Sequence, residues 1–255
     1  MRLTVLGSGD AFGTGGRLQT AFHVAVGSAA STGSASDRFL VDCGSTALIG
    51  LRRAGLEPND VGTIYISHLH GDHYGGLPFW MLDGQHVSRR TAPLLIAGPP
   101  GIEARFVALG EAMFPGSTKA RRRFDMRFVE YEFGKPMTIG PAVVTAREVV
   151  HPSGAPSCAL RIEAGAKTLA YSGDTEWTDA LLPTSDGADL FICECYGVEP
   201  SAPFHIDWQM LSAKLPEITA KRLLLTHMGA AMLAKSATLA HPRVQCAHDG
   251  LVLDI

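Results

Sequence analysis

A predicted strand that runs straight into a dense group of metal-ligand residues is the feature that most constrains this chain. The apolar run 64–67, Ile-Tyr-Ile-Ser, is followed within six residues by four such side chains, His68, His70, Asp72 and His73. Imidazole nitrogens and carboxylate oxygens are ligands for zinc and other divalent transition ions. Gly71 lets the backbone curl so that these side chains converge. Because unpaired polar groups cost free energy in a core, this density predicts a metal site rather than packing.

Three later segments repeat one arrangement, an apolar strand with a single candidate ligand after its carboxyl end. The runs over 143–150, 168–172 and 222–226 lead in turn to His151, Asp174 and His227. In layered α/β sheets, sites form outside the carboxyl ends of strands, where loops from separate segments meet. We therefore expect the seven candidates to lie together at one rim of the fold.

The rest of the chain predicts alternating strands and helices. The expected elements include a hairpin pair at Phe22–Val26 and Phe39–Val41 and helices at Ile102–Met113 and Met228–Ala240. The small polar residues 27–37, inside the hairpin pair, are expected to form a flexible loop tip. No linker or internal repeat interrupts the alternation, which predicts one α/β layered domain over 1–255.

The composition limits the classes of partner. Hydrophobic residues make up 46% of the 255 residues, enough for a full core. The net charge of −3 and the pI near 6.4 give no overall attraction for polyanions, so a nucleic-acid substrate would need a local basic patch. The candidates for such a patch are Lys119, Arg121, Arg122, Arg123 and Arg127, with Arg89 and Arg90 as a second pair. A solvated surface is the favoured interpretation of these charges.

The cysteines and the apolar runs indicate a cellular location. The five cysteines are odd in number and have no regular spacing, which argues against a disulfide framework and fits a reducing compartment. The opening MRLTVLGSGD lacks the pattern of a secretory signal. No apolar stretch approaches the roughly 20 residues of a membrane span. We expect a cytoplasmic protein without membrane contact.

These motifs together resemble the metallo-β-lactamase superfamily. The matching elements are the His-x-His-x-Asp-His run at 68–73, His151, Ser-Gly-Asp-Thr at 172–175, Thr-His at 226–227, Leu-Gly-Ser-Gly at 6–9 and Val-Asp-Cys-Gly at 41–44. Within the superfamily the chain is most similar to the branch of small phosphodiesterases and RNase Z, the transfer RNA 3′-processing endonuclease. The resemblance implies an α/β fold of the αββα sandwich type, with two mixed β-sheets flanked by helices.

The resemblance also implies two divalent metal ions and assigns their ligands. One metal falls to His68, His70 and His151, the second to Asp72, His73 and His227, and both are bridged by Asp174. A hydroxide between the metals is then the nucleophile, because a metal lowers the pKa of bound water and a metal pair clamps the attacking and leaving oxygens. Zinc (Zn2+) is the first expectation. Manganese (Mn2+) or iron (Fe) are alternatives, because the ligand set contains no cysteine.

Three residues are expected to act in catalysis, namely Asp72, Glu194 and His205. In the RNase Z branch a histidine between the bridging aspartate and the last ligand assists at the phosphate and the leaving group, and His205 occupies the matching place. The alternative is a plain helix-start histidine, with Asp207 either orienting it or capping the following helix. Glu194 resembles a glutamate of that branch and would orient a histidine. For Cys193 and Cys195, core packing is favoured over metal binding.

Two departures from the RNase Z pattern argue against transfer RNA as the substrate. The interval 74–150 is filled by expected strands and helices, which leaves no long Gly- and Pro-rich arm, and Met228-Gly229-Ala230 replaces a Ser-x-Arg-Tyr-like ending. The expected function is a phosphodiesterase acting on a small-molecule or nucleotide-type ester, in a chain that the branch implies is a homodimer. An ester, lactone or thioester hydrolase is the alternative. A non-catalytic metal-binding protein is disfavoured, because all seven ligand positions are filled.

Overall fold

Two mixed β-sheets lie face to face in the structure, a computed structural model that describes residues 1–27 and 37–255. Among these residues the first sheet has seven strands in the order β14-β1-β2-β3-β4-β5-β6. Its strands are β1 Arg2–Gly7, β2 Ala21–Ala25, β3 Arg38–Val41, β4 Thr63–Tyr65, β5 Leu94–Gly98, β6 Met126–Glu130 and β14 Val252–Asp254. The pairs from β14 to β3 are antiparallel and those from β3 to β6 are parallel.

The second sheet mirrors the first in its mixture of pairings. Its seven described strands have the order β13-β12-β11-β10-β9-β8-β7. They are β7 Pro136–Ile139, β8 Ala142–Val149, β9 Ser157–Ala164, β10 Lys167–Tyr171, β11 Leu190–Glu194, β12 Leu223–Thr226 and β13 Val244–Cys246. The strands β7 to β10 pair antiparallel, and β10 to β13 pair parallel.

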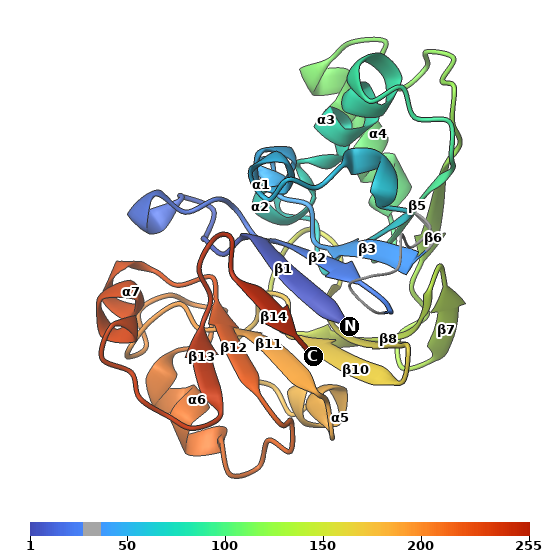
Figure 1. The fold of residues 1–255 in the computed structure, drawn as a ribbon. Helices are drawn as coiled ribbons and strands as arrows, with labels where there is room; N and C mark the ends of the chain where they lie inside the picture. The colour runs from blue at the N-terminus through green and yellow to red at the C-terminus, as the bar shows by residue number, and fades with distance from the viewer. Residues whose placement is uncertain (28–36) are drawn as a thin grey trace.

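Helices cover the outer face of each sheet (Figure 1). The α-helices are α1 Ala47–Arg53, α2 Gly71–Tyr74, α3 Leu77–Leu82, α4 Ile102–Met113, α5 Leu181–Ser185, α6 Trp208–Lys214 and α7 Ala230–Ser236. The short helical turns are η1 Thr14–Gly16, η3 Pro58–Asp60 and η4 Asp83–Val87. The αββα arrangement expected from the resemblance is confirmed.

Alternation along the strands divides the core into three layers. In β9, Cys158, Leu160 and Ile162 face the other sheet, whereas Ala159 faces the outer helices. Successive side chains of a strand point to opposite faces, so a strand with helices on one side and a sheet on the other is apolar throughout. The edge-to-face contact of Phe22 in β2 with Tyr171 in β10, at 5.7 Å between ring centroids, joins the two sheets.

Several expected elements agree with the structure. The predicted helix Ile102–Met113 is α4, and β2 and β3 form the antiparallel pair. The predicted helix Met228–Ala240 is shorter, because only Ala230–Ser236 is helical. Of the expected loop tip at 27–37, residues 28–36 lie outside the described residues. No helix in the described part of the chain has the length and apolar character needed to cross a membrane.

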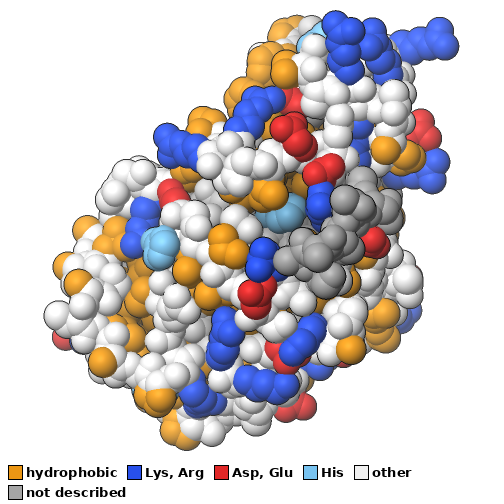
Figure 2. Space-filling view, in the orientation of Figure 1, with side chains coloured by type: hydrophobic (Ala, Val, Ile, Leu, Met, Phe, Trp, Pro, Cys, Tyr) orange, Lys and Arg blue, Asp and Glu red, His pale blue; other side chains and the backbone are white. Residues whose placement is uncertain are grey.

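The basic residues divide into an exposed group and one buried exception. Lys119, Arg121 and Arg123 are exposed, and basic side chains gather at the end of the molecule formed by α3 and α4 (Figure 2). Arg90 does not belong to a solvated surface, because it is 1% exposed. Its guanidinium donates to the backbone carbonyls of Pro58, Val61, Ala92 and Pro93 at 2.8–3.2 Å. These bonds pair the buried donors of Arg90 with carbonyl oxygens.

Replacing Arg90 with Met should lower the free energy of unfolding by about 3 kcal/mol, because buried carbonyls then lack a donor. Chemical denaturation of the variant and of Arg121→Met, the exposed control, measures the difference. We expect the control to stay within about 0.5 kcal/mol of the wild type. If Arg90→Met also stayed within about 0.5 kcal/mol of the wild type, the structural role of Arg90 would be contradicted.

Candidate metal centre

The ends of four strands bring the seven candidate ligands to one edge of the sandwich. The turn after β4 carries His68 and His70, and α2 carries Asp72 and His73. The other three follow strands of the second sheet, with His151 after β8, Asp174 after β10 and His227 after β12. The cluster therefore spans both sheets, as the position of its members at strand ends predicts.

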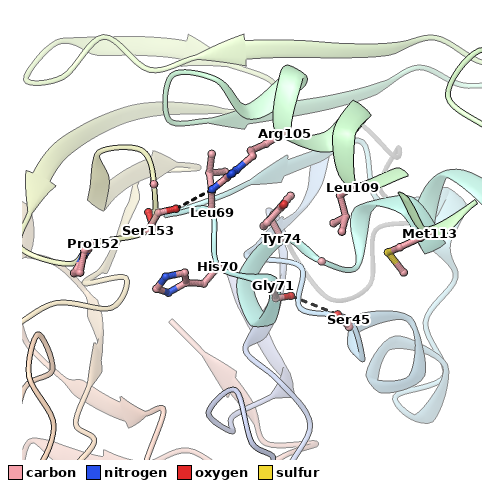
Figure 3. A pocket seen from close by; sticks show the side chains of 12 residues that line it. Ser45, Leu69, His70, Gly71, Tyr74, Arg105, Leu109, Met113, Pro152 and Ser153 are labelled. Atoms are coloured by element: carbon pink, nitrogen blue, oxygen red, sulfur yellow. Dashed lines mark hydrogen bonds between the residues drawn. The ribbon is translucent and has the colours of Figure 1, made fainter. Parts of the chain in front are cut away.

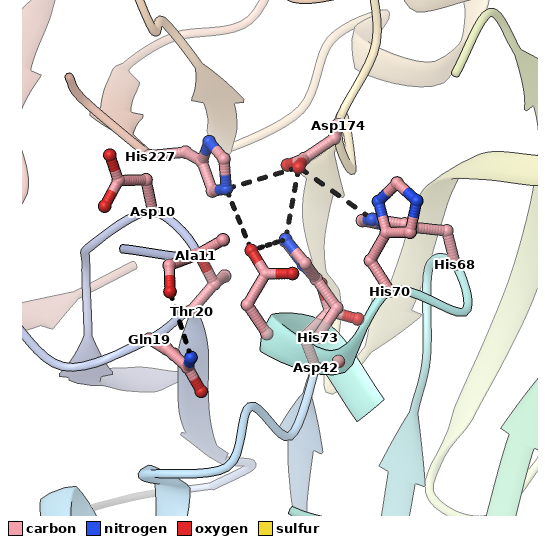
Figure 4. Close-up of polar contacts among 12 residues, drawn as sticks. Asp10, Ala11, Gln19, Thr20, Asp42, His68, His70, His73, Asp174 and His227 are labelled. Carbon is pink, nitrogen blue, oxygen red and sulfur yellow. Dashed lines mark hydrogen bonds and ion pairs between the residues drawn. The ribbon is translucent and has the colours of Figure 1, made fainter. Parts of the chain in front are cut away.

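The seven side chains form two groups that each have the size of a metal site. One group is His68, His70 and His151, and the other is Asp72, His73, Asp174 and His227, with the ligand atoms of each group within 4.8 Å of one another. Asp174 belongs to the second group and also lies next to the first (Figure 4). Its Oδ2 is 3.2 Å from Nε2 of His73 and of His227, and 3.8 Å and 4.0 Å from Nε2 of His68 and of His151.

Buried polar atoms without a hydrogen-bond partner are one reason why the cluster fits a cation. Nε2 of His68 and Oδ1 of Asp174 lack a hydrogen-bond partner among the described residues, and Nε2 of His73 has only the ion-pair contacts with Asp72 and Asp174 at 3.2 Å. Buried polar atoms are otherwise paired, and each exception needs an explanation. Converging imidazole and carboxylate donors are the set that divalent transition ions take. The residues present therefore fit a metal site.

Hydrogen bonds on the far side of the rings hold three of the histidines in place. His73 Nδ1 lies 2.7 Å from Asp42 Oδ2, and His68 Nδ1 lies 3.0 Å from Ser67 Oγ. His151 Nδ1 lies 3.0 Å from the carbonyl oxygen of Phe204. Donation of Nδ1–H to such acceptors fixes the tautomer and leaves Nε2 free to bind a metal.

The electrostatics of the two groups differ. Burial holds the pKa of His68 well below its usual value, which favours the neutral imidazole that a metal needs. Burial also lowers the pKa of His227, but the charge of Asp174 and the hydrogen bond to Asp72 outweigh it and raise the pKa to about 9. His73 behaves in the same way, with the pKa raised well above normal by the carboxylates despite burial. The carboxylate-rich group thus attracts positive charge.

His205 and Glu194 form a pair beside the cluster. Both carboxylate oxygens of Glu194, which is fully buried, lie 3.1 Å from His205 Nδ1. The His205 ring stacks on His227 at 5.5 Å between centroids. Burial lowers the pKa of His205, but the hydrogen bond to Glu194 outweighs it, so the pKa is raised. Asp207 accepts from the Met210 N–H and caps α6, so Glu194, rather than Asp207, contacts the ring.

Two further sequence expectations can be compared with the geometry. Cys193 and Cys195 are buried in the layer beneath α5 to α7, which confirms core packing. Asp42 was matched only as part of the Val-Asp-Cys-Gly motif and was given no role. Its place after the apolar strand β3 is the same signal that identified the candidate ligands, although Asp42 contacts His73 rather than joining the ligand groups.

The comparisons with known proteins agree with this geometry. The family model described as Anti-Pycsar protein Apyc1 matches residues 1–245. The chain belongs to this family. The probable metallo-hydrolase YhfI of Bacillus subtilis is 30% identical to this Apyc1-family chain over 197 residues, which is 74% of each protein.

Solved structures show the same fold as the Apyc1-family chain. The crystal structure of YhfI, a metallo-β-lactamase fold protein, matches with a TM-score of 0.77 at 24% identity and covers 99% of this chain and 98% of its own. The short form of human tRNase Z has a TM-score of 0.75 at 23% identity, with 100% and 99% covered. A diphosphatase of the PhnP family has a TM-score of 0.75 at 19% identity, with 100% and 97% covered. The fold is that of the metallo-β-lactamase proteins.

Changing Asp42 to Asn should weaken divalent-metal binding by about 10- to 100-fold, because His73 loses the carboxylate that orients it. Asn keeps the shape of Asp and tolerates the left-handed backbone at this position, where φ is 57°. Competition with a chromophoric chelator measures the metal dissociation constant. Tyr171→Phe is the control, since it removes a different donor to the same carboxylate. Equal losses in both variants would mean that the orientation of His73 is not the cause.

Proposed function

We propose that this protein is a dinuclear metal-dependent phosphodiesterase, with zinc as the first candidate metal and manganese or iron as alternatives. In this proposal His68, His70 and His151 hold one ion, Asp72, His73 and His227 hold the other, and Asp174 contacts both. Divalent ions held in this way lower the pKa of water and offset the charge of a phosphate group. The two groups of ligand atoms, bridged by one carboxylate, support two ions rather than one.

The observation that carries the phosphodiester assignment is the Glu194–His205 pair. Glu194 engages Nδ1 of His205, which leaves Nε2 as the ring nitrogen available to a ligand in the cavity that His205 lines. We infer that His205 donates a proton to the leaving oxygen, and that Glu194 orients the ring. We further propose that Asp72, which lines the same cavity, would hold the second ion and orient the attacking water. Relatives of the fold named as a transfer RNA nuclease and as a diphosphatase are consistent with a phosphate ester.

The size of the cavity favours a small substrate over transfer RNA. The space over the ligand cluster has a volume of about 490 Å³, within the range of small-molecule sites. The interval 74–150, which is described throughout, is used by α3 to β8 and by their connections. We propose a nucleotide-type ester or another small phosphodiester as the substrate.

An exposed ring on a rigid loop supports a substrate with a planar group. Phe12 lines this cavity, and 84% of the residue is exposed. The buried carboxylate of Asp10 fixes the loop, since it accepts from the backbone N–H groups of Phe12 at 3.2 Å and Thr14 at 2.9 Å. A rigid, exposed aromatic ring beside a phosphate site is suited to stacking on a base.

Turnover of bis(p-nitrophenyl) phosphate by the purified protein, with zinc or manganese added, is the first test. We expect Asp174→Ala to abolish it, because both groups of ligands lose their shared carboxylate. His205→Ala should lower kcat by about 100-fold on this substrate, and less on thioesters and lactones. The exposed His248→Ala is the matched control and should leave kcat unchanged. Absence of turnover with both metals, or undiminished turnover in Asp174→Ala, would contradict the proposal.

Replacing Phe12 with Ala should raise KM for the p-nitrophenyl ester of thymidine 5′-phosphate by about tenfold, because stacking on a base contributes about 1–3 kcal/mol. Phe12→Trp should retain the wild-type KM, and Phe12→Leu should resemble Phe12→Ala. In all three variants kcat and metal content should be unchanged. A wild-type KM in Phe12→Ala would show that the ring does not contact the substrate.

A further inference from the structure

A second cavity, on the α4 side of the ligand cluster, is not used by the proposed chemistry. Its volume is about 450 Å³. His70 and Gly71 line both this cavity and the one over the cluster, so the two spaces meet at a candidate metal ligand. Figure 3 shows Arg105 and Leu109 from α4 on one side of it, and His70 and Pro152 on the other. We call this space the α4 cavity.

Arg105 supplies positive charge to the α4 cavity. Its Nη2 donates to the carbonyl oxygen of Ser153 at 3.3 Å. Among the described residues its guanidinium forms no ion pair, and none of the residues lining the cavity is an aspartate or glutamate. A guanidinium has five N–H donors in a planar fork, so most of them remain available to a ligand. The cavity therefore has a cation and no anion to balance it.

The loop after β8, which carries the candidate ligand His151, contacts the guanidinium of Arg105 through Ser153. Ser153 follows His151 by two residues, and the hydroxyl of Ser157 donates to the carbonyl of His151 at 2.7 Å. A Cβ atom on Gly154 would lie 2.5 Å from Nη2 of Arg105, and Gly154 has φ of 80°. Glycine at position 154 thus permits the positive φ of the turn and leaves room for the guanidinium of Arg105. Arg105 is placed against the same loop that presents His151 to the cluster.

The remaining walls suit an anionic group that arrives from the cluster. Tyr74 is only 7% exposed, and Leu69, Leu109 and Met113 supply apolar surface. Arg105 itself is exposed, so an anion would reach its guanidinium from solvent, with the apolar residues on one side of the pair. The planar fork matches two oxygens of a phosphate or a carboxylate.

We propose that the α4 cavity is an anion subsite, in which Arg105 binds a second phosphate or carboxylate group of the substrate. The scissile ester would lie at the ligand cluster and the second anion beyond His70. The proposal rests on the proposed phosphodiesterase function for the identity of the scissile group. A free anion such as inorganic phosphate would meet the same chemistry, so the experiment must separate the two sources.

Two substrates that differ in one phosphate provide the activity test. These are the p-nitrophenyl ester of thymidine 5′-phosphate and the same ester with an added 3′-phosphate. We expect wild-type protein to have the lower KM for the second. Arg105→Gln should raise that KM by about tenfold and change the KM of the first by less than about twofold. Arg105→Lys should keep part of the preference, since it keeps the charge.

A matched control and a structural readout accompany this comparison. Arg53→Gln removes an exposed arginine that lines a separate cavity next to β1 and β14, and it should change neither KM. If Arg105 only supported the loop that carries His151, Arg105→Gln would lower kcat equally on both substrates. That result, or equal KM values of the wild type for the two substrates, would overturn the proposal.

A binding measurement keeps the test independent of turnover. Calorimetry should show thymidine 3′,5′-bisphosphate binding to the metal-loaded wild type about tenfold more tightly than thymidine 5′-monophosphate, and Arg105→Gln should lose this difference. The result stands even if neither ester is hydrolysed, so it separates failure of the subsite from failure of the proposed function. Arg105-dependent binding of inorganic phosphate, with no advantage of the bisphosphate, would assign the cavity to a free anion and overturn the substrate subsite.

Discussion

The buried carboxylate of Asp42 joins the two sheets and the ligand cluster. It accepts hydrogen bonds from the backbone and hydroxyl of Ser67, at 2.8 Å and 2.9 Å, and from the Tyr171 hydroxyl at 2.7 Å, and it lies 2.7 Å from His73 Nδ1. Ser67 and His73 belong to the ligand segment after β4, whereas Tyr171 lies in β10 of the other sheet. A fully buried carboxylate is tolerated only when its oxygens are satisfied. The position of His73 is therefore tied to the packing of one sheet on the other.

Sequence patterns identified the parts of the fold that are determined locally. The helix Ile102–Met113 has apolar residues at helical spacing, and the ligands follow strands because parallel strands end at a common edge. The strand β14 was missed, since it has three residues and half-exposed side chains, and it forms by pairing with β1. Arg90 was misplaced on the surface for a related reason. Two of the carbonyls that surround it, those of Pro58 and Val61, lie 32 and 29 residues earlier in the chain and reach it only in the folded protein.

The ligand cluster could be predicted more fully than its surroundings. Each candidate ligand follows an apolar strand; His151, Asp174 and His227 are weak signals singly, but the seven residues together in this order are a strong one. The cavity walls have no such local signal, because Phe12 and Arg105 come from a loop and a helix that are far apart in the chain. His205 was predicted only through the resemblance. Histidine and arginine are common on protein surfaces, so they are recognised as candidate site residues only when the structure places them around one cavity. The shape and lining of the cavities therefore indicate the substrate class, which the order of residues in the sequence does not.

The carbonyl of Phe204 contacts a candidate ligand, His151, while the next residue, His205, faces the same cavity. Phe204 has φ of 63°, a conformation that residues other than glycine adopt only when their surroundings enforce it. One short stretch of backbone thus positions both His151, a candidate metal ligand, and His205, the proposed proton donor. Displacing it would loosen both together. The side chains of His151 and His205, to which the proposal gives different roles, therefore share one structural support.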